Sequence, residues 1–181
     1  MQISFNWLKE YIDLELSAYE LQELMTKAGV TVEHVQATNK GIEKVVTAKV
    51  LEKMKHPNAE KLSICQVTTD GQTTMQVVCG APNVAAGQTV AFALPGAHLP
   101  DGIKIKKAKL RGVESNGMIC SSKELGIDPE KIPPEQKEGI VILPDDTPLG
   151  VSITEIMGLD DYILELDLTP NRSDCLSVLN V

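Results

Sequence analysis

Aromatic residues are scarce in this sequence of 181 residues, which contains one Trp, three Tyr and two Phe. Because 43% of the residues are nevertheless hydrophobic, the core must consist mainly of Val, Ile, Leu and Ala side chains. No hydrophobic run approaches the roughly 18 residues of a membrane-spanning helix. The N-terminus also lacks the basic and apolar segments of a signal peptide. We therefore expect a globular, cytoplasmic protein that does not enter a membrane.

Signatures of metal and nucleotide sites are also missing. The four cysteines show no CxxC spacing, and the first three lie in apolar strand-like patterns that are typical of buried, reduced thiols (Cys65, Cys79, Cys120 and Cys175). A zinc site that combined them with His56 would need four convergent ligands. The sequence contains neither a P-loop nor a GxGxxG motif. We expect no cofactor and no metal in this chain.

Positive charge is concentrated in one part of an acidic chain. The whole sequence has a net charge of −8, whereas residues 41–112 contain ten Lys or Arg and five Asp or Glu. A local positive surface of this kind can hold a polyanion while the acidic remainder repels it. The pattern favours a nucleic-acid-binding segment on an acidic support. The ten cations are Lys44, Lys49, Lys53, Lys55, Lys61, Lys104, Lys106, Lys107, Lys109 and Arg111.

The two ends of the chain have mixed helix and strand patterns. Residues 1–40 predict two helices and a strand, with a capping box that begins at Ser17 and a helix end at Gly29. Residues 151–181 predict a short helix, a strand and a last helix. In that strand, residues 162–168, the leucines share one face.

The last predicted helix begins after Ser173, with Leu176 and Leu179 on its apolar side, and it reaches Val181 without a stop signal. We therefore expect the natural protein to continue beyond this sequence. Each end is too small to fold alone. We predict that residues 1–40 and 151–181 form one discontinuous, C-terminally truncated α+β domain.

Residues 41–150 are predicted to be inserted into that domain as a small β-barrel. Short strands separated by Gly and Pro turns are typical of such barrels, and Asp70-Gly71 indicates a hairpin. A short helix over residues 122–126 and a Pro-rich acidic loop should complete the segment. The predicted strands cover residues 46–50, 62–67, 75–79, 89–93, 103–110 and 118–120. The predicted fold class is therefore mainly β with α+β flanks.

The fifth predicted strand carries five of the cations. Ile103 and Ile105 share one face, whereas Ala108 and Leu110 have the opposite parity. A β-bulge near residues 106–107 would reconcile the two and turn all five cations outward. The alternative is an exposed edge strand whose lysines only discourage aggregation.

Three stretches together resemble the tRNA-binding oligonucleotide-binding (OB) domain found in several tRNA-associated proteins. They are HPNAEKL at residues 56–62, VCGAPNV at 78–84 and RGVESNGMICS at 111–121. The start of the chain and LTPNRSDCLS at 168–177 are similar to the bacterial phenylalanyl-tRNA synthetase β subunit. The resemblance covers essentially the whole chain, although the family's β subunit is several times longer.

The resemblance implies an OB-fold that binds tRNA and carries no catalytic site. The longer protein would be an ATP-dependent enzyme that joins phenylalanine to its tRNA as an α2β2 assembly. Its ATP, phenylalanine and magnesium sites would lie beyond residue 181. The partners would be tRNA and the α subunit. We expect the tRNA contacts to come from His56, Asn58, Lys61, Lys104, Lys106, Lys107, Lys109, Arg111, Ser115 and Ser121.

The composition of the segment limits how it can bind RNA. Residues 41–112 contain one aromatic residue, Phe92, so a stacking platform for single strands is not expected. Cations without aromatic residues suit the phosphates and shape of a folded RNA. We expect sequence-tolerant contact, with Lys and Arg supplying charge. His56 and Asn58 have two possible roles, stabilising a turn or touching RNA.

Two other functions remain open at this point. The same basic strand could dock the barrel against an acidic patch of a partner subunit, because a fold does not determine a function. A hydrolase with Cys120 or Ser121 as nucleophile is formally possible, but no G-x-S-x-G elbow supports it.

Overall fold

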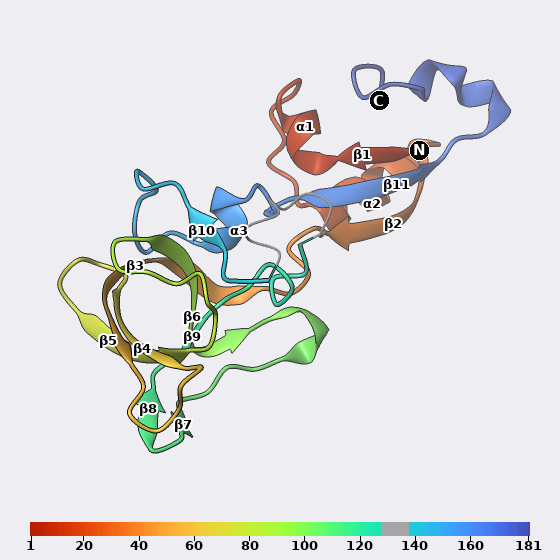
Figure 1. Ribbon diagram of the computed structural model, residues 1–181. Coiled ribbons are helices and arrows are strands. Elements are labelled where there is room, and N and C mark those ends of the chain that lie inside the picture. The colour runs from red at the N-terminus through yellow and green to blue at the C-terminus, as the bar shows by residue number, and fades with distance from the viewer. Residues whose placement is uncertain (128–137) are drawn as a thin grey trace. The chain divides into compact units, whose positions relative to one another are not determined.

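The computed structural model describes residues 1–127 and 138–181, and it divides the chain into two compact units (Figure 1). Met1–Asn39 and Gly158–Val181 form the first unit, and Lys40–Met157 forms the second. Residues 151–157, which we had assigned to the terminal segments, lie in the second unit. The reason is that the Thr47 amide donates to the Val151 carbonyl at 2.9 Å, and Val46 forms a β-bridge with Ser152.

The first unit is a three-stranded antiparallel sheet in which the last strand of the chain lies in the middle. Leu164 and Leu166 of that strand are 0% and 2% exposed, which confirms the predicted leucine face. They pack in a core cluster with Ile3, Phe5 and other side chains from both ends of the chain. The elements are β1 (Gln2–Ser4), α1 (Phe5–Lys9), α2 (Ala18–Lys27), β2 (Thr31–Ala37) and β11 (Tyr162–Asp167).

Helix α2 begins and ends where the sequence indicates. The Ser17 hydroxyl accepts a hydrogen bond from the Glu20 amide at 3.3 Å, and the Glu20 carboxylate accepts one from the Ser17 amide at 2.8 Å. This is the predicted capping box. Gly29 follows the helix with a φ of +88°, a conformation that side chains disfavour.

The last predicted helix is wrong in its type and in its buried face. Residues Pro170–Cys175 form a 3-10 helix, and Leu176 and Leu179 are 68% and 70% exposed. Cys175 and Val178 are buried instead. The helix ends at Cys175, and residues 176–180 form bends and turns, so the helical spacing of the two leucines does not apply to them.

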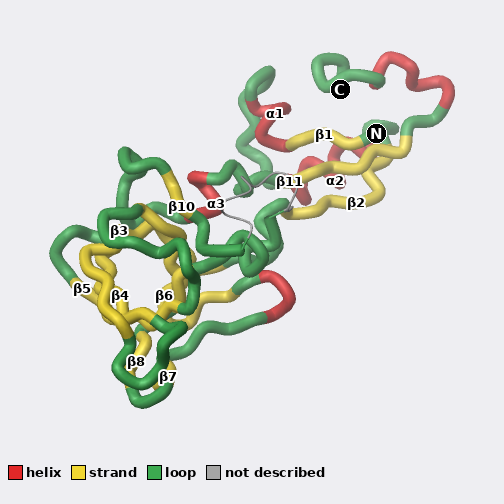
Figure 2. Tube along the Cα trace, viewed as in Figure 1, coloured by secondary structure: helices red, strands yellow, loops and turns green. Residues whose placement is uncertain are grey.

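The second unit contains a strongly curved sheet, whose strands form a ring in Figure 2. The hydrogen-bonded order is β10-β6-β3-β4-β5, and β9 also pairs with β6. The curled sheet with few helices confirms the predicted OB-like, mainly β fold class. The strands are β3 (Glu43–Lys55), β4 (Ser63–Thr68), β5 (Thr74–Cys79), β6 (Thr89–His98), β7 (Ala108–Leu110), β8 (Val113–Ser115), β9 (Met118–Ile119) and β10 (Ile142–Leu143).

The core of this unit is aliphatic, as the composition predicts. Phe92 is its one aromatic side chain among the described residues, and it is fully buried between Val, Ile, Ala and Cys side chains. Thr47 is also fully buried, on the other face of β3 from its neighbour Ala48. Its hydroxyl donates to the Pro148 carbonyl at 2.6 Å and accepts from the Val151 amide at 3.1 Å, so a second layer covers this part of the strand.

The predicted fifth strand is only partly correct. The structure has a 3-10 turn at Pro100–Gly102 and a short strand at Ala108–Leu110. Ile105 is buried, because its amide donates to the Ala97 carbonyl at 2.9 Å, whereas Ile103 is 47% exposed. Ala108 and Leu110 are exposed as well, so the inward-facing pattern that we expected on either side of a bulge is absent.

The remaining segments are short. Residues 122–126 form hydrogen-bonded turns instead of the predicted helix, and α3 (Ile153–Ile156) matches the short helix predicted near residue 152. The part of the predicted Pro-rich loop at 128–137 lies outside the described residues. Within the ranges that the structure covers, no helix has both the length and the apolar character needed to cross a membrane.

Candidate nucleic-acid interface

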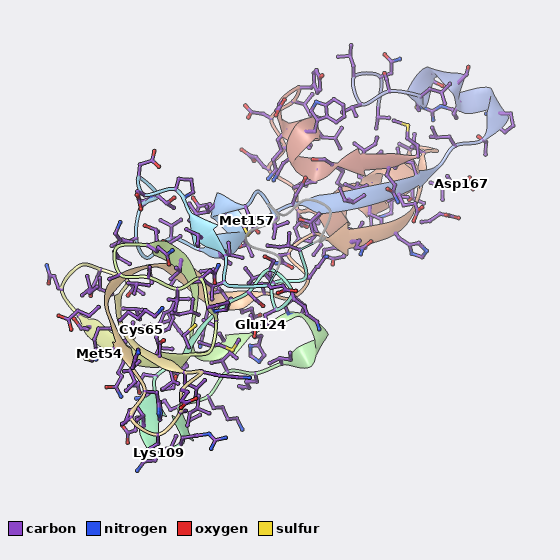
Figure 3. All side chains as sticks on the ribbon, viewed as in Figure 1. Met54, Cys65, Lys109, Glu124, Met157 and Asp167 are labelled. Atoms are coloured by element: carbon purple, nitrogen blue, oxygen red, sulfur yellow. The ribbon has the colours of Figure 1, made fainter. Side chains whose placement is uncertain are left out.

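The hairpin formed by β7 and β8 carries Lys109 and Arg111, and the other three cations of residues 104–111 directly precede it in the chain. Leu110 pairs with Val113, which leaves Arg111 and Gly112 as a two-residue turn. Their φ angles are +47° and +93°, as a type I′ turn requires. Arg111 is therefore held exposed at the tip of the hairpin in a conformation that non-glycine residues seldom adopt. Figure 3 labels Lys109 on this hairpin, which projects from the ring of strands.

Two residues of the loop between β3 and β4 hold the tip of this hairpin. His56 is 5% exposed, and its Nε2 lies 3.2 Å from the Leu110 carbonyl oxygen, while its Nδ1 accepts from the Asn58 amide at 3.0 Å. The Asn58 Nδ2 donates to the Arg111 carbonyl at 3.3 Å. The turn-stabilising role of this pair is thus present in the structure, and contact of either residue with RNA stays a prediction.

All six candidate cations are exposed to solvent (Lys61, Lys104, Lys106, Lys107, Lys109 and Arg111). No carboxylate of the described residues lies within ion-pair distance of any of them. Glu114 pairs across the hairpin with Lys109, so it partly offsets the positive charge there. By contrast, two other basic residues of the segment have partners: Lys49 lies 3.4 Å from Asp145, and Lys53 donates to the Val84 carbonyl at 2.7 Å.

The five cations of residues 104–111 do not all line the same surface. A cavity of about 600 Å³ is lined by Lys104, Lys106, Ala108 and Leu110, together with residues of β5, β8 and β9. Lys107, Lys109 and Arg111 are exposed but are not among its lining residues. The alternation of β7 accounts for part of this separation, because Ala108 and Leu110 project from one side of the strand and Lys109 from the other.

The two candidate serines take part in hydrogen bonds within the fold. Ser115 is 3% exposed, and its hydroxyl accepts from the Val78 amide at 3.1 Å and donates to the Gly117 carbonyl at 2.9 Å. Ser121 is half-buried at the cavity, and its hydroxyl donates to the Glu124 carboxylate at 2.8 Å. In this geometry Ser115 offers almost no surface to a ligand, whereas Ser121 remains partly accessible.

The neighbouring thiol is not suited to act as a nucleophile. Cys120 is fully buried, and burial raises the pKa of its thiol to about 12. A thiol reacts as its thiolate, which is scarce at neutral pH when the pKa is this high. Among the residues that the structure describes, no group of three or more His, Cys, Asp or Glu side chains is placed to hold a metal ion.

One cation of the site was missed by reasoning from the sequence. Lys123 is exposed and lines the cavity together with Lys104 and Lys106. It lies outside residues 41–112, the segment in which the positive charge was counted. The signal that could have identified it is its position directly after the third resembling stretch, which ends at Ser121.

Comparisons with known proteins identify the family of the chain. A protein-family model described as "Putative tRNA binding domain" matches residues 45–152. The chain is 52% identical over its whole length to the phenylalanine–tRNA ligase beta subunit of Geobacillus kaustophilus, and 50% identical to that of Geobacter metallireducens. It spans only 23% and 22% of these two relatives.

A solved structure was also found, a MetRS related protein from Pyrococcus horikoshii. The two chains are 16% identical with a TM-score of 0.43, and the match covers 77% of this chain and 99% of the other. The family match and the relatives confirm the resemblance inferred from the three stretches and the flanks. The chain belongs to this tRNA-binding domain family, and over its full length it is similar to part of the phenylalanine–tRNA ligase beta subunit.

Proposed function

We propose that this chain is the tRNA-binding module of a phenylalanine–tRNA ligase beta subunit, and that it holds folded tRNA through the exposed cations of the β7–β8 hairpin and the adjoining loops. The observation that carries the proposal is the hairpin itself. It presents Lys109 and Arg111 to solvent, with Lys107 exposed just before β7, and none of the three has an ion-pair partner among the described residues. His56 holds the tip of the hairpin.

The chemistry of this surface favours phosphate contacts. Lys and Arg bind phosphates of any sequence and release counterions when they do so. The one aromatic side chain of the barrel core, Phe92, is fully buried and offers no platform for stacking. We therefore expect sequence-tolerant binding through roughly three to five phosphates, with a slope of log K against log salt of about −2 to −4.

A salt series tests this mode of binding. Fluorescence anisotropy of labelled tRNA should give the expected slope, and replacing Lys104, Lys106 and Lys107 by Glu should abolish binding while the circular dichroism spectrum stays that of the wild type. Replacing Lys9 and Lys27 by Glu is the control, because it also lowers the net charge but changes only the first unit. A flat salt response, or unchanged affinity of the folded triple variant, contradicts the proposal.

The partners follow from the same proposal. We infer that the full-length protein assembles with an α subunit, and that the ATP and magnesium used to charge tRNA bind elsewhere in that enzyme, in the cytoplasm. The chain itself would then perform no chemistry. Docking to the α subunit is the rival role for the basic hairpin. Gel shifts of the chain with total tRNA and, separately, with the α subunit distinguish the two roles, because only the partner that contacts the basic segment before β7 loses its shift in the triple variant.

A further inference from the structure

The cavity beside the hairpin combines an apolar floor with a basic rim. Its volume is about 600 Å³, within the usual range for small-ligand sites. We call its apolar lining the floor: Val78 and Ile105 are buried, Met118 is half-buried, and Ala108 and Leu110 are exposed. The rim includes Lys104, Lys106 and Lys123, each of them exposed.

The distribution of charge in the cavity argues against a phosphate in its interior. Two carboxylates, Glu124 and Glu138, also line it. One Glu124 oxygen already accepts from the Ser121 amide at 2.6 Å and from its hydroxyl at 2.8 Å. An anion inside would meet these acids, whereas an uncharged, flat group would meet apolar side chains and hydrogen-bond acceptors.

We propose that this cavity receives one unstacked nucleobase of a bound RNA, while the phosphates on either side of that nucleotide lie on Lys104, Lys106 and Lys123. A base is flat, largely apolar on its faces and polar at its edge, which matches an apolar floor beside carboxylates. An exocyclic amino group can donate to those carboxylates, whereas a phosphate cannot. This inference rests on the proposed function, and it adds a contact with a base to the proposed contacts with phosphates.

The test compares two RNA probes that carry the same phosphates. One is a labelled ten-nucleotide oligoadenylate, and the other is the same backbone without bases. The wild type should bind the first at least about fivefold more tightly, because removing about 40 Å² of a base's apolar surface from water contributes roughly that factor. Ala108→Phe fills the cavity without changing a charge, so it should bring the two affinities together and leave the salt slope unchanged.

Matched variants isolate the cavity from the rest of the surface. Ala85→Phe is the control, because Ala85 is exposed in the same unit and does not line the cavity. It should keep the preference for the probe with bases. A second measurement does not depend on any variant: adenosine monophosphate should compete with the oligoadenylate for the wild type at least about fivefold better than ribose 5-phosphate, because only the first has a base to bury.

The possible outcomes separate this inference from the proposed function. Equal wild-type affinity for both probes, or a preference that survives in folded Ala108→Phe, overturns the base site while tRNA binding stands. Loss of binding to every RNA, tRNA included, overturns the proposed function and the base site together. Equally tight binding of a labelled deca-glutamate peptide also overturns the base site, because it assigns the rim to an acidic protein segment.

Discussion

Arg111 has a backbone conformation that lowers the stability of the folded protein. With a φ of +47° in a type I′ turn, it stands where Asn is the preferred residue before Gly. We predict that Arg111→Asn raises the free energy of unfolding by about 0.5–1 kcal/mol, since the left-handed conformation costs most other residues roughly that amount or more. The same change should weaken tRNA binding and make the salt slope less steep by about one.

Urea denaturation and anisotropy measure the two effects of this substitution separately. Arg111→Lys is the matched control, because it keeps both the charge and the unfavourable conformation, and it should change neither quantity appreciably. If the Asn variant is more stable and yet binds tRNA as the wild type does, Arg111 makes no phosphate contact.

Asp70 organises the turn between β4 and β5. Its carboxylate accepts from the amides of Thr73 and Gln72 at 2.7 and 2.8 Å and from the Thr73 hydroxyl at 2.8 Å. These hydrogen bonds, led by the one from the Thr73 amide, lower the pKa of Asp70 well below its ordinary value of 3.8. The folded state therefore favours the ionised carboxylate, and this contribution is present above pH 3.8 and is lost as the pH falls further.

The pH dependence of Asp70→Asn follows directly. We predict that this variant is less stable than the wild type at neutral pH, because the amide lacks the charge that strengthens the three hydrogen bonds. The difference in unfolding free energy should shrink as the pH falls below 4, because the Asp70 carboxyl of the unfolded wild-type chain takes up a proton there while that of the folded protein stays ionised. Urea titrations from pH 2 to pH 7 measure it, and a difference that stays constant over this range contradicts the assignment.

At the scale of elements, the β7–β8 hairpin depends on the loop that precedes β4. His56→Ala leaves the Leu110 carbonyl without its side-chain partner and removes a buried ring, so we predict a loss of about 1–3 kcal/mol in unfolding free energy. The tRNA affinity should also fall because the hairpin tip is less well held. The salt slope should stay the same, because an imidazole that is 5% exposed offers little surface to a phosphate.

His34→Ala is the matched control for this prediction. His34 is an exposed histidine on β2 of the first unit, and its loss should affect neither stability nor binding appreciably. The opposite result for His56→Ala, wild-type stability with a salt slope reduced by about one, would show instead that the ring contacts RNA directly.

The elements that could be predicted are those whose side-chain pattern is local and regular. The capping box at Ser17 and the leucine face of β11 have fixed spacings, and both are present. The prediction of one strand over residues 103–110 failed because hydrogen bonds to residues 96 and 97 determine the position of Ile105. The spacing of apolar residues within 103–110 carries no information about these bonds. The prediction of the last helix failed because the chain is helical only over Pro170–Cys175, so the leucines that follow lie in bends and turns outside any helical face.

The sequence predicts which charged residues belong to the candidate site, but it does not predict how they are arranged in space. The sequence identifies the cations of residues 104–111, but only the three-dimensional structure shows which of them line the cavity. Ser115 is a candidate RNA contact because it lies in the third resembling stretch. Its hydroxyl is buried against β5, where it accepts a hydrogen bond from the Val78 amide, more than thirty residues earlier in the chain. Contacts between segments this far apart cannot be derived from the spacing within either one.

At the scale of the whole molecule, the second unit is inserted between two neighbouring points of the first. The Thr38 amide donates to the Asp161 carbonyl at 2.9 Å, and its hydroxyl donates to the Leu159 carbonyl at 2.6 Å. Each unit also contains its own cluster of buried apolar side chains. The chain therefore leaves and re-enters the first unit across a single pair of adjacent strands.

This arrangement predicts that each unit folds without the other. Residues 40–157 expressed alone should unfold cooperatively and retain the tRNA affinity of the whole chain to within about threefold, because every proposed contact lies in this unit. Residues 1–39 joined to 158–181 by a short Gly-rich linker should form the β1-β11-β2 sheet and bind no tRNA. Circular dichroism, urea denaturation and anisotropy test both fragments. Binding of tRNA by the joined fragment, or its loss from folded residues 40–157, would place the interface outside the barrel.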